Sequence, residues 1–112
     1  MPKPATRPYS RYGRDAAILL GQLIRLGRAE RRMTVEELAE RAGVSRGLIH
    51  RVEKGDPGCA IGAVFEAAAI VGVRLFDADQ PTLAGRVATN AATLTLLPQT
   101  VRASSGAVKD DF

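Results

Sequence analysis

The stretch Thr34–Gly55, TVEELAERAGVSRGLIHRVEKG, holds the signals for two short helices with a sharp turn between them. Thr34 is a residue type that caps helix N-termini. Glu37, three places on, completes a capping box, in which each side chain accepts a hydrogen bond from the other residue's backbone N–H. The first helix is therefore expected from Val35 to about Arg41.

The turn that follows is Ala42-Gly43-Val44, with glycine at the position where the backbone needs a positive φ. Ser45 is again an N-cap type, and it predicts a second helix from Arg46 to about Lys54, which Gly55 ends. Two short helices joined in this way are typical of a helix-turn-helix unit, although any helical hairpin with a glycine turn has a similar outline.

The apolar residues of the stretch recur at spacings that place them on the inner side of both helices. Ala39 is small where the helices must approach each other closely. The inward set comprises Leu38, Ala42, Val44, Ile49 and Val52. The outer face of the second helix then carries Arg46, Gly47, His50 and Arg51. An exposed cationic second helix indicates a recognition helix, the element that enters the major groove of DNA.

The charge of the chain is unevenly distributed. Residues 1–54 hold 12 Lys and Arg against 6 Asp and Glu, whereas residues 55–112 hold 4 against 6. The positive half contains the helix-turn-helix, as expected of a face that binds phosphates. A basic surface that serves only solubility has the same charge, so the motif and the charge together carry the DNA-binding hypothesis.

Composition argues against several other classes of protein. The single cysteine, Cys59, excludes an internal disulfide, and with one histidine it provides no cluster of metal ligands. No acid pair, nucleophile–base pair or phosphate-binding loop is present, so neither an enzyme nor a cofactor is expected. No apolar run reaches the roughly 20 residues that span a bilayer, and the basic N-terminus has no apolar signal core. A cytoplasmic protein without membrane contact is expected.

The segments on either side complete a small domain. Residues 1–13 hold three prolines and several basic residues, and they predict a flexible basic arm. One helix is expected from about Arg14 to Arg32 and another from Ala60 to Val71, which packs across the helix-turn-helix and completes a four-helix core. Residues 14–72 are thus interpreted as the DNA-binding domain.

Residues 73–97 are interpreted as a dimerisation or partner-binding region. Side-chain polarity alternates along Val73–Asp77. This pattern is consistent either with a short strand that pairs across a two-fold dimer or with an extended linker. A helix is expected from Thr82 to about Leu97, although its residues have low helix propensity. Its apolar stripe comprises Leu83, Val87, Leu94 and Leu97. Residues 98–112 are small, polar and charged, and they predict a disordered tail.

Thr34 to Val73 resembles the Xre/Cro-type helix-turn-helix family of bacterial and phage regulators. The residues that carry the likeness are Thr34, Glu36-Glu37-Leu38-Ala39, Ala42-Gly43-Val44-Ser45, Ile49, Arg51, Glu53 and Gly55. The segment GDPGCAIGAVFEAAAIVGVRLFDAD, the helix beyond it and the KDDF ending are similar to HipB-type antitoxins, which accompany HipA-type kinase toxins. The resemblance implies a mainly α, lambda-repressor-like helix-turn-helix bundle of four to five helices.

The resemblance also implies partners and site residues. Such proteins bind palindromic operator DNA as homodimers, repress their own operon and join a HipA-like kinase toxin. The base-contacting positions of the family correspond here to Arg46, Gly47, His50 and Arg51. Its phosphate-contacting positions correspond to Thr34, Ser45 and Lys54. An arginine of the first helix and a glutamate late in the recognition helix form a structural pair in the family, which here implies Arg28 with Glu53.

Two departures narrow this interpretation. Val35 stands where many members have glutamine, which removes one phosphate hydrogen bond, and Gly47 has no side chain to read a base. Arg46 and Arg51 therefore become the main candidates for guanine contacts. The alternatives are a solvent-exposed His50 without a role and a surface salt bridge for Arg51. The alternative to a regulator is an interaction module that neutralises a partner toxin or kinase with little DNA role.

Overall fold

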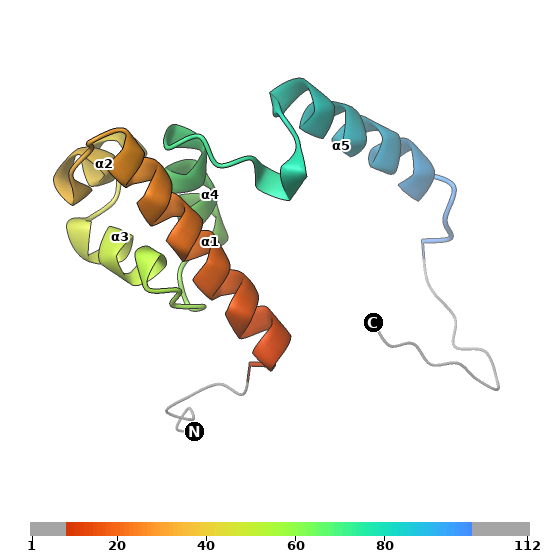
Figure 1. Cartoon of the computed structure of the whole chain (residues 1–112). Coiled ribbons are helices and arrows are strands. Elements are labelled where there is room, and N and C mark those ends of the chain that lie inside the picture. Colours follow the sequence, from red (N-terminus) through yellow and green to blue (C-terminus); the bar gives the residue numbers. More distant parts are fainter. Residues whose placement is uncertain (1–8, 100–112) are drawn as a thin grey trace. The chain divides into compact units, whose positions relative to one another are not determined.

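The structure, a computed structural model, describes residues 9–99, and within them the chain is helical (Figure 1). The chain divides into two compact units, with the boundary after Asp77. The elements are α1 Arg11–Glu30, α2 Val35–Ala42, α3 Arg46–Glu53, α4 Ile61–Ile70, a short 3₁₀ turn η1 at Leu75–Asp77, and α5 Gln80–Leu94. The predicted mainly α helix-turn-helix bundle is confirmed.

In the first unit, α1 and α2 each pack against both α3 and α4. The largest fully buried side chains come one from each of these four helices and their caps: Ile24, Leu38, Ile49 and Val71. Of the predicted inward set, Leu38, Ile49 and Val52 are buried, whereas Ala42 and Val44 are half-buried. Burying the inner sides of α2 and α3 fixes which side of α3 faces outward.

Close crossings in this unit depend on two glycines of α1. A Cβ on Gly21 would overlap the backbone carbonyl of Val52 at the end of α3. A Cβ on Gly27 would lie 2.7 Å from the backbone oxygen of Val71. Because a side chain at either position would push a helix away, these glycines set the separation of α1 from α3 and α4.

The helices α2 and α3 end in the same way. The N–H of Gly43 bonds the Glu40 carbonyl and that of Val44 bonds the Ala39 carbonyl, at 3.2 and 3.0 Å. At the end of α3, Gly55 bonds Val52 and Asp56 bonds Arg51, both at 3.0 Å. This pair of bonds is the Schellman motif, and its φ of 74° at Gly43 and 82° at Gly55 favours glycine. The motif brings together the side chains that flank it, which on α3 are Arg51 and Asp56.

Helix α1 begins earlier than predicted. Ser10 is its N-cap, with its Oγ accepting a hydrogen bond from the N–H of Gly13 at 3.0 Å, so residues 11–13 are helical rather than part of an arm. The prolines that argued for the arm all precede this cap. Residues 1–8 and 100–112, which hold the rest of the predicted arm and most of the predicted tail, lie outside the described residues.

The strand considered for Val73–Asp77 is wrong, and residues 9–99 contain no strand. Phe76 and Asp77 both have a φ of 55°, which turns the backbone into η1 and breaks the alternation of faces. The ring of Phe76 meets that of Phe65 on α4 edge to face, with the ring centroids 6.2 Å apart. This contact ties η1 to the first unit.

The second unit contains α5. Asp79 caps it by accepting the N–H of Thr82 at 2.9 Å, and proline occupies the first turn, so the helix begins two residues before the predicted start. It ends at Leu94, three residues before the predicted end, and none of its residues is buried. The apolar stripe is therefore carried by Leu83, Val87 and Leu94, while Leu97 lies beyond the helix.

Candidate nucleic-acid interface

The outer face of α3 carries all four predicted base-contacting positions. Ser45 caps the helix, with its Oγ accepting the N–H of Leu48 at 3.1 Å. Ile49 and Val52 on the inner side are buried against α1, α2 and α4. The side chains that remain outside are those of Arg46, His50 and Arg51, and Gly47 lies beside them, all four residues being exposed.

The orientation of α3 is locked at its end by a largely buried ion pair. The Arg28 guanidinium donates to both carboxylate oxygens of Glu53, with Nε–Oε2 at 2.6 Å and Nη2–Oε1 at 2.9 Å. A third bond runs from Nη1 to the Met33 carbonyl at 3.0 Å. The two side chains are only 15% and 6% exposed. The bonds to Glu53 raise the pKa of Arg28 against the opposing effect of burial. The structural pair implied by the family resemblance is confirmed.

Arg46 stands at the first position of α3 and makes a loose contact with α2. Its Nη1 lies 3.3 Å from Oε2 of Glu36, and the two side chains are 66% and 70% exposed. An exposed pair of this kind contributes at most about 1 kcal/mol, because water and salt screen both charges. Phosphate or base oxygens can therefore replace Glu36 as the partner of this guanidinium at little cost.

Arg51 is held more tightly. Its Nε donates to Oδ2 of Asp56 at 2.8 Å, and the other oxygen, Oδ1, accepts the N–H of Gly58 at 2.8 Å. Both bonds lower the pKa of Asp56, and the bond to the carboxylate raises the pKa of Arg51. The surface salt bridge considered for Arg51 is thus present. Residue type and helical spacing did not predict Asp56 as its partner, although the glycine stop at position 55 was a signal for it.

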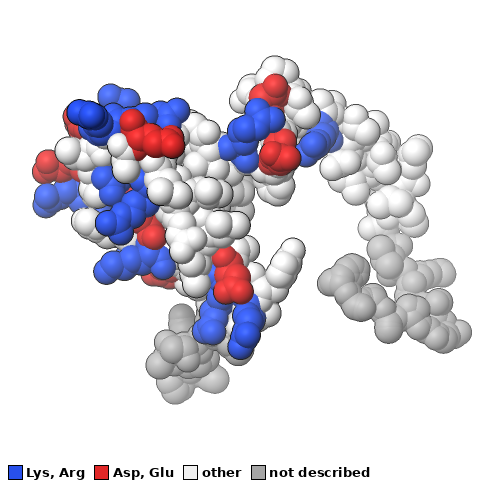
Figure 2. Space-filling view, in the orientation of Figure 1, with Lys and Arg blue, Asp and Glu red and all other residues white. Residues whose placement is uncertain are grey.

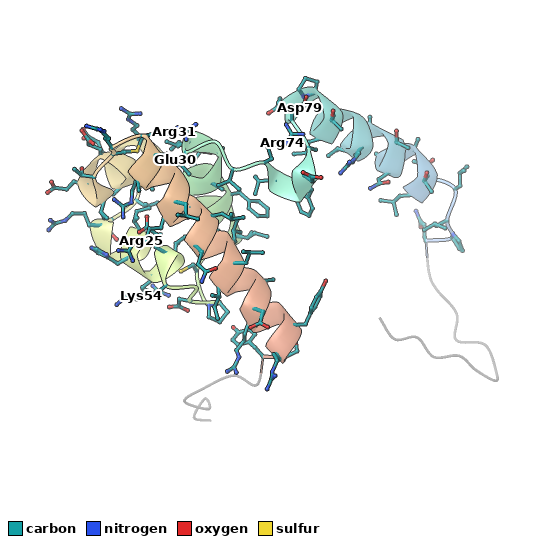
Figure 3. All side chains as sticks on the ribbon, in the orientation of Figure 1. Arg25, Glu30, Arg31, Lys54, Arg74 and Asp79 are labelled. Atoms are coloured by element: carbon teal, nitrogen blue, oxygen red, sulfur yellow. The ribbon has the colours of Figure 1, made fainter. Side chains whose placement is uncertain are left out.

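The predicted phosphate-contacting residues lie at the ends of α2 and α3. The Thr34 Oγ1 accepts the N–H of Glu37 at 3.0 Å, and the Glu37 carboxylate accepts the Thr34 N–H at 2.9 Å, which completes the predicted capping box. Because capping uses the hydroxyls of Thr34 and Ser45 as acceptors, their O–H groups remain available as donors. Lys54 is the exposed C-cap of α3. It shares a shallow groove with Arg25 of α1 (Figure 3), which sequence analysis did not assign to the site.

One comparison with known proteins identifies the class of this unit. A family model described as a helix-turn-helix domain matches residues 19–83, more than half of the chain. The chain belongs to this helix-turn-helix family. No curated protein shows significant similarity to it. The matched segment contains α2, the Gly43 turn and α3, so the two short helices predicted from sequence are the helix-turn-helix itself.

The charges of the helix-turn-helix domain and of α5 differ. Figure 2 shows Lys and Arg side chains, mixed with acidic ones, over the helices of the domain. Arg86 is the one charged residue within α5. The basic side chains of the first half of the chain thus lie on the domain that contains α3, and the phosphate-binding face stays a prediction.

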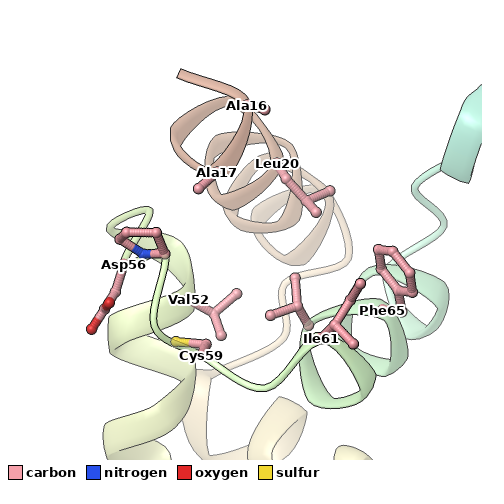
Figure 4. A pocket seen from close by; sticks show the side chains of 10 residues that line it. Ala16, Ala17, Leu20, Val52, Asp56, Cys59, Ile61 and Phe65 are labelled. Atoms are coloured by element: carbon pink, nitrogen blue, oxygen red, sulfur yellow. The ribbon is translucent and has the colours of Figure 1, made fainter. Parts of the chain in front are cut away.

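Other kinds of site find little support. Residues 9–99 hold no cluster of His, Cys, Asp or Glu suited to a metal ion, and no helix among them is long and apolar enough to cross a membrane. Cys59 is partly buried beside an apolar pocket lined by Leu20, Val52 and Ile61 among others (Figure 4). Burial raises the pKa of its thiol, with Arg51 acting in the opposite direction. A protonated thiol in apolar surroundings suits packing better than chemistry.

Proposed function

We propose that this helix-turn-helix protein is a sequence-specific transcriptional regulator that binds palindromic operator DNA as a homodimer. The observation that carries the proposal is the division of α3 into two sides. One side is fixed by Ile49, Val52 and the largely buried side chain of Glu53, and the other exposes Arg46, His50 and Arg51. A helix held rigidly from behind, with cationic donors in front, suits docking into the major groove.

Base reading is assigned to Arg46 and Arg51, with His50 between them on the same face. Guanidinium groups recognise guanine through O6 and N7. Gly47 supports this assignment, since a Cβ there would meet nothing closer than Ser45 Oγ at 3.9 Å. Packing does not require glycine at that position, whereas close approach of DNA to the helix would.

Phosphate binding is assigned to Thr34, Ser45 and Lys54. The two hydroxyls lie at the N-termini of α2 and α3, where backbone N–H groups and the helix dipole also favour anions. Lys54 lies at the other end of α3 and adds a flexible positive charge. Arg25, in the same groove as Lys54, extends this positive surface onto α1. Such contacts should make affinity fall as salt concentration rises.

The finer proposal is an autorepressing antitoxin of a HipA-type system. It rests on the resemblance of residues 55–79 and of the KDDF ending to HipB-type antitoxins. The apolar stripe of α5, with Val87 and Leu94 more than 60% exposed, supports a region that binds a second copy or a partner protein. That stripe also favours the second candidate function, an interaction module that neutralises a toxin or kinase with little DNA role.

The test begins with wild-type protein and a library of duplexes randomised over about three helical turns, from which the preferred operator is selected. Arg46→Ala should weaken binding to that operator by roughly 1–3 kcal/mol and relax base preference at one position per half-site. Arg74→Ala is the matched control, because it removes an exposed charge from the same unit away from α3.

Three results would count against the proposal. Unchanged operator affinity of Arg46→Ala excludes its assignment. If Arg46→Ala and Arg74→Ala weaken binding equally for every DNA sequence, Arg46 contributes only non-specific electrostatic attraction. A wild-type mass near 11.9 kDa in light scattering at micromolar concentration opposes the homodimer. A chain that selects no sequence but copurifies with a kinase favours the second candidate function.

A further inference from the structure

Arg51 and Asp56 are joined by more than their ion pair. The N–H of Asp56 bonds the carbonyl of Arg51 as part of the Schellman motif that ends α3. The carboxylate of Asp56 uses Oδ1 to accept the N–H of Gly58 and Oδ2 to accept Nε of Arg51. In Figure 4 this carboxylate points away from the apolar pocket beside it. The acceptor for Arg51 is thus fixed in space by the turn itself.

The bond through Nε determines which N–H donors of the guanidinium are not used by Asp56. Arginine has five N–H donors, and Nε carries one of them. No hydrogen bond to Asp56 uses the two Nη groups, whose shared edge presents paired donors. Such a pair of parallel donors can bond O6 and N7 of guanine. The Arg51 side chain as a whole is 53% exposed.

We propose that Asp56 is a positioning residue for base readout, which holds the Arg51 guanidinium so that its Nη edge faces a guanine in each half-site. This inference rests on the proposed function and adds a specificity-determining residue to it. An unrestrained arginine loses much rotamer freedom when it forms a bidentate contact. A side chain already held by Asp56 loses less, so the contact becomes stronger and more selective.

Asp56 has an opposite effect as well, because its negative charge repels DNA phosphates. The two effects predict opposite changes in operator affinity when Asp56 is substituted. Loss of a positioning group lowers affinity for the operator and spares non-specific DNA, whereas loss of a repelling charge raises affinity for every duplex. The sign and the sequence dependence of one substitution therefore decide between them.

The experiment uses Asp56→Asn in the full chain. Its amide oxygen can still accept the N–H of Gly58, while its NH₂ group cannot accept from Arg51 Nε, so the turn is kept and the ion pair is lost. The probe is the operator selected by wild type, together with duplexes in which single guanines are replaced by 7-deazaguanine, which lacks N7. Arg51→Ala and the double variant complete a mutant cycle, and a circular dichroism melt verifies folding.

Wild type should lose affinity when 7-deazaguanine replaces the guanine that Arg51 contacts in each half-site. Arg51→Ala identifies that guanine, because this variant should not respond to the substitution there. We expect Asp56→Asn to bind the unmodified operator about threefold to tenfold more weakly and to respond less to that substitution. Scrambled DNA should be bound as before. The double variant should be no weaker than Arg51→Ala, because Asp56 acts through Arg51. A merely structural role for Asp56 would lower the melting temperature without changing the response to 7-deazaguanine.

Other outcomes overturn the inference. It is wrong if Asp56→Asn responds to 7-deazaguanine as wild type does, or if it binds all duplexes more tightly. An Arg51→Ala variant with wild-type specificity also excludes it while leaving the proposed function intact. If wild type itself selects no sequence, the proposed function fails, and the inference fails with it.

Discussion

Two arginine–carboxylate pairs, one on the inner side of α3 and one at the end of its outer side, behave differently. On the inner side, Glu53 meets Arg28 of α1 through two hydrogen bonds, with side chains 15% and 6% exposed. On the outer side, Arg51 meets Asp56 through a single bond, with side chains 53% and 37% exposed. The inner pair joins residues 25 positions apart in sequence, whereas the outer pair joins residues only five positions apart.

The difference follows from solvent. A charge removed from water depends on its partner, so breaking the inner pair leaves an uncompensated group in the interior. The outer pair is screened and contributes little to stability, and its single bond to Asp56 uses only the Nε–H of the arginine. An arginine–carboxylate pair therefore fixes the recognition helix on its inner side, while arginine N–H donors remain available on its outer side. Substitutions that affect one side of α3 and spare the other test this division.

The largest effect is expected from the inner pair. Glu53→Gln removes the negative charge with little change in shape and leaves the Arg28 guanidinium largely buried without its counter-ion. Stability should fall by about 3 kcal/mol, measured by urea unfolding followed by circular dichroism. Asp56→Asn is the matched control on the outer side, and its unfolding midpoint should stay close to that of wild type.

A second substitution separates charge from packing. Adding Arg28→Met to Glu53→Gln removes the unpaired charge, so the double variant should recover part of the lost stability. The comparison between the two sides fails if Glu53→Gln costs less than the outer substitution. It fails equally if the double variant is as unstable as the sum of the two single variants.

The next effect concerns the separation of α1 from the inner side of α3. Gly21→Ala would place a Cβ against the carbonyls of Val52 and Glu53, which are backbone groups that cannot turn aside. We expect a loss of about 1–3 kcal/mol in the same unfolding experiment, because the helices must move apart. Gly62→Ala on α4 is the control, since a Cβ there meets nothing within 4 Å. Equal stability of the two variants would show that α1 tolerates a wider spacing.

Local signals in the sequence predicted the helix-turn-helix well. The capping box of Thr34 and Glu37, the Ser45 cap and the turn at Gly43 all depend on bonds within a few residues, and each is present. The pairing of Arg28 with Glu53 was available only through family resemblance. Features that depend on the spacing of helices, such as Gly21 against Val52, leave no periodic pattern in the chain.

Both errors of prediction concern contacts that depend on three-dimensional geometry, which residue type and spacing do not determine. The alternation of apolar and polar residues in Val73–Asp77 was consistent with a strand or an extended linker. A strand requires a partner, and the left-handed backbone of Phe76 directs its ring to Phe65 instead. For the interface, residue type and helical spacing placed Arg51 on the outer face. They did not reveal that Asp56 holds it, because that contact follows from the geometry of the turn at Gly55.

The smallest change in stability is expected on the outer side, at Gly47. This residue and Gly62 are both the second residue of a helix, and neither has a neighbour that would resist a Cβ. Alanine at either position should leave the fold intact or stabilise it by up to about 1 kcal/mol, because glycine is the poorer helix former. Stability alone therefore cannot distinguish the two variants.

DNA binding should distinguish them. If the groove approaches α3 closely at Gly47, the added methyl group displaces the DNA, and operator affinity falls by about tenfold in Gly47→Ala. Gly62→Ala should bind as wild type does in the same titration. Equal operator affinities of the two variants would mean that the DNA does not come close to the start of α3. The DNA-contacting part of the helix would then lie nearer Arg51. A loss confined to Gly47→Ala, in a protein at least as stable as wild type, would separate the functional side of α3 from its structural side at a single methyl group.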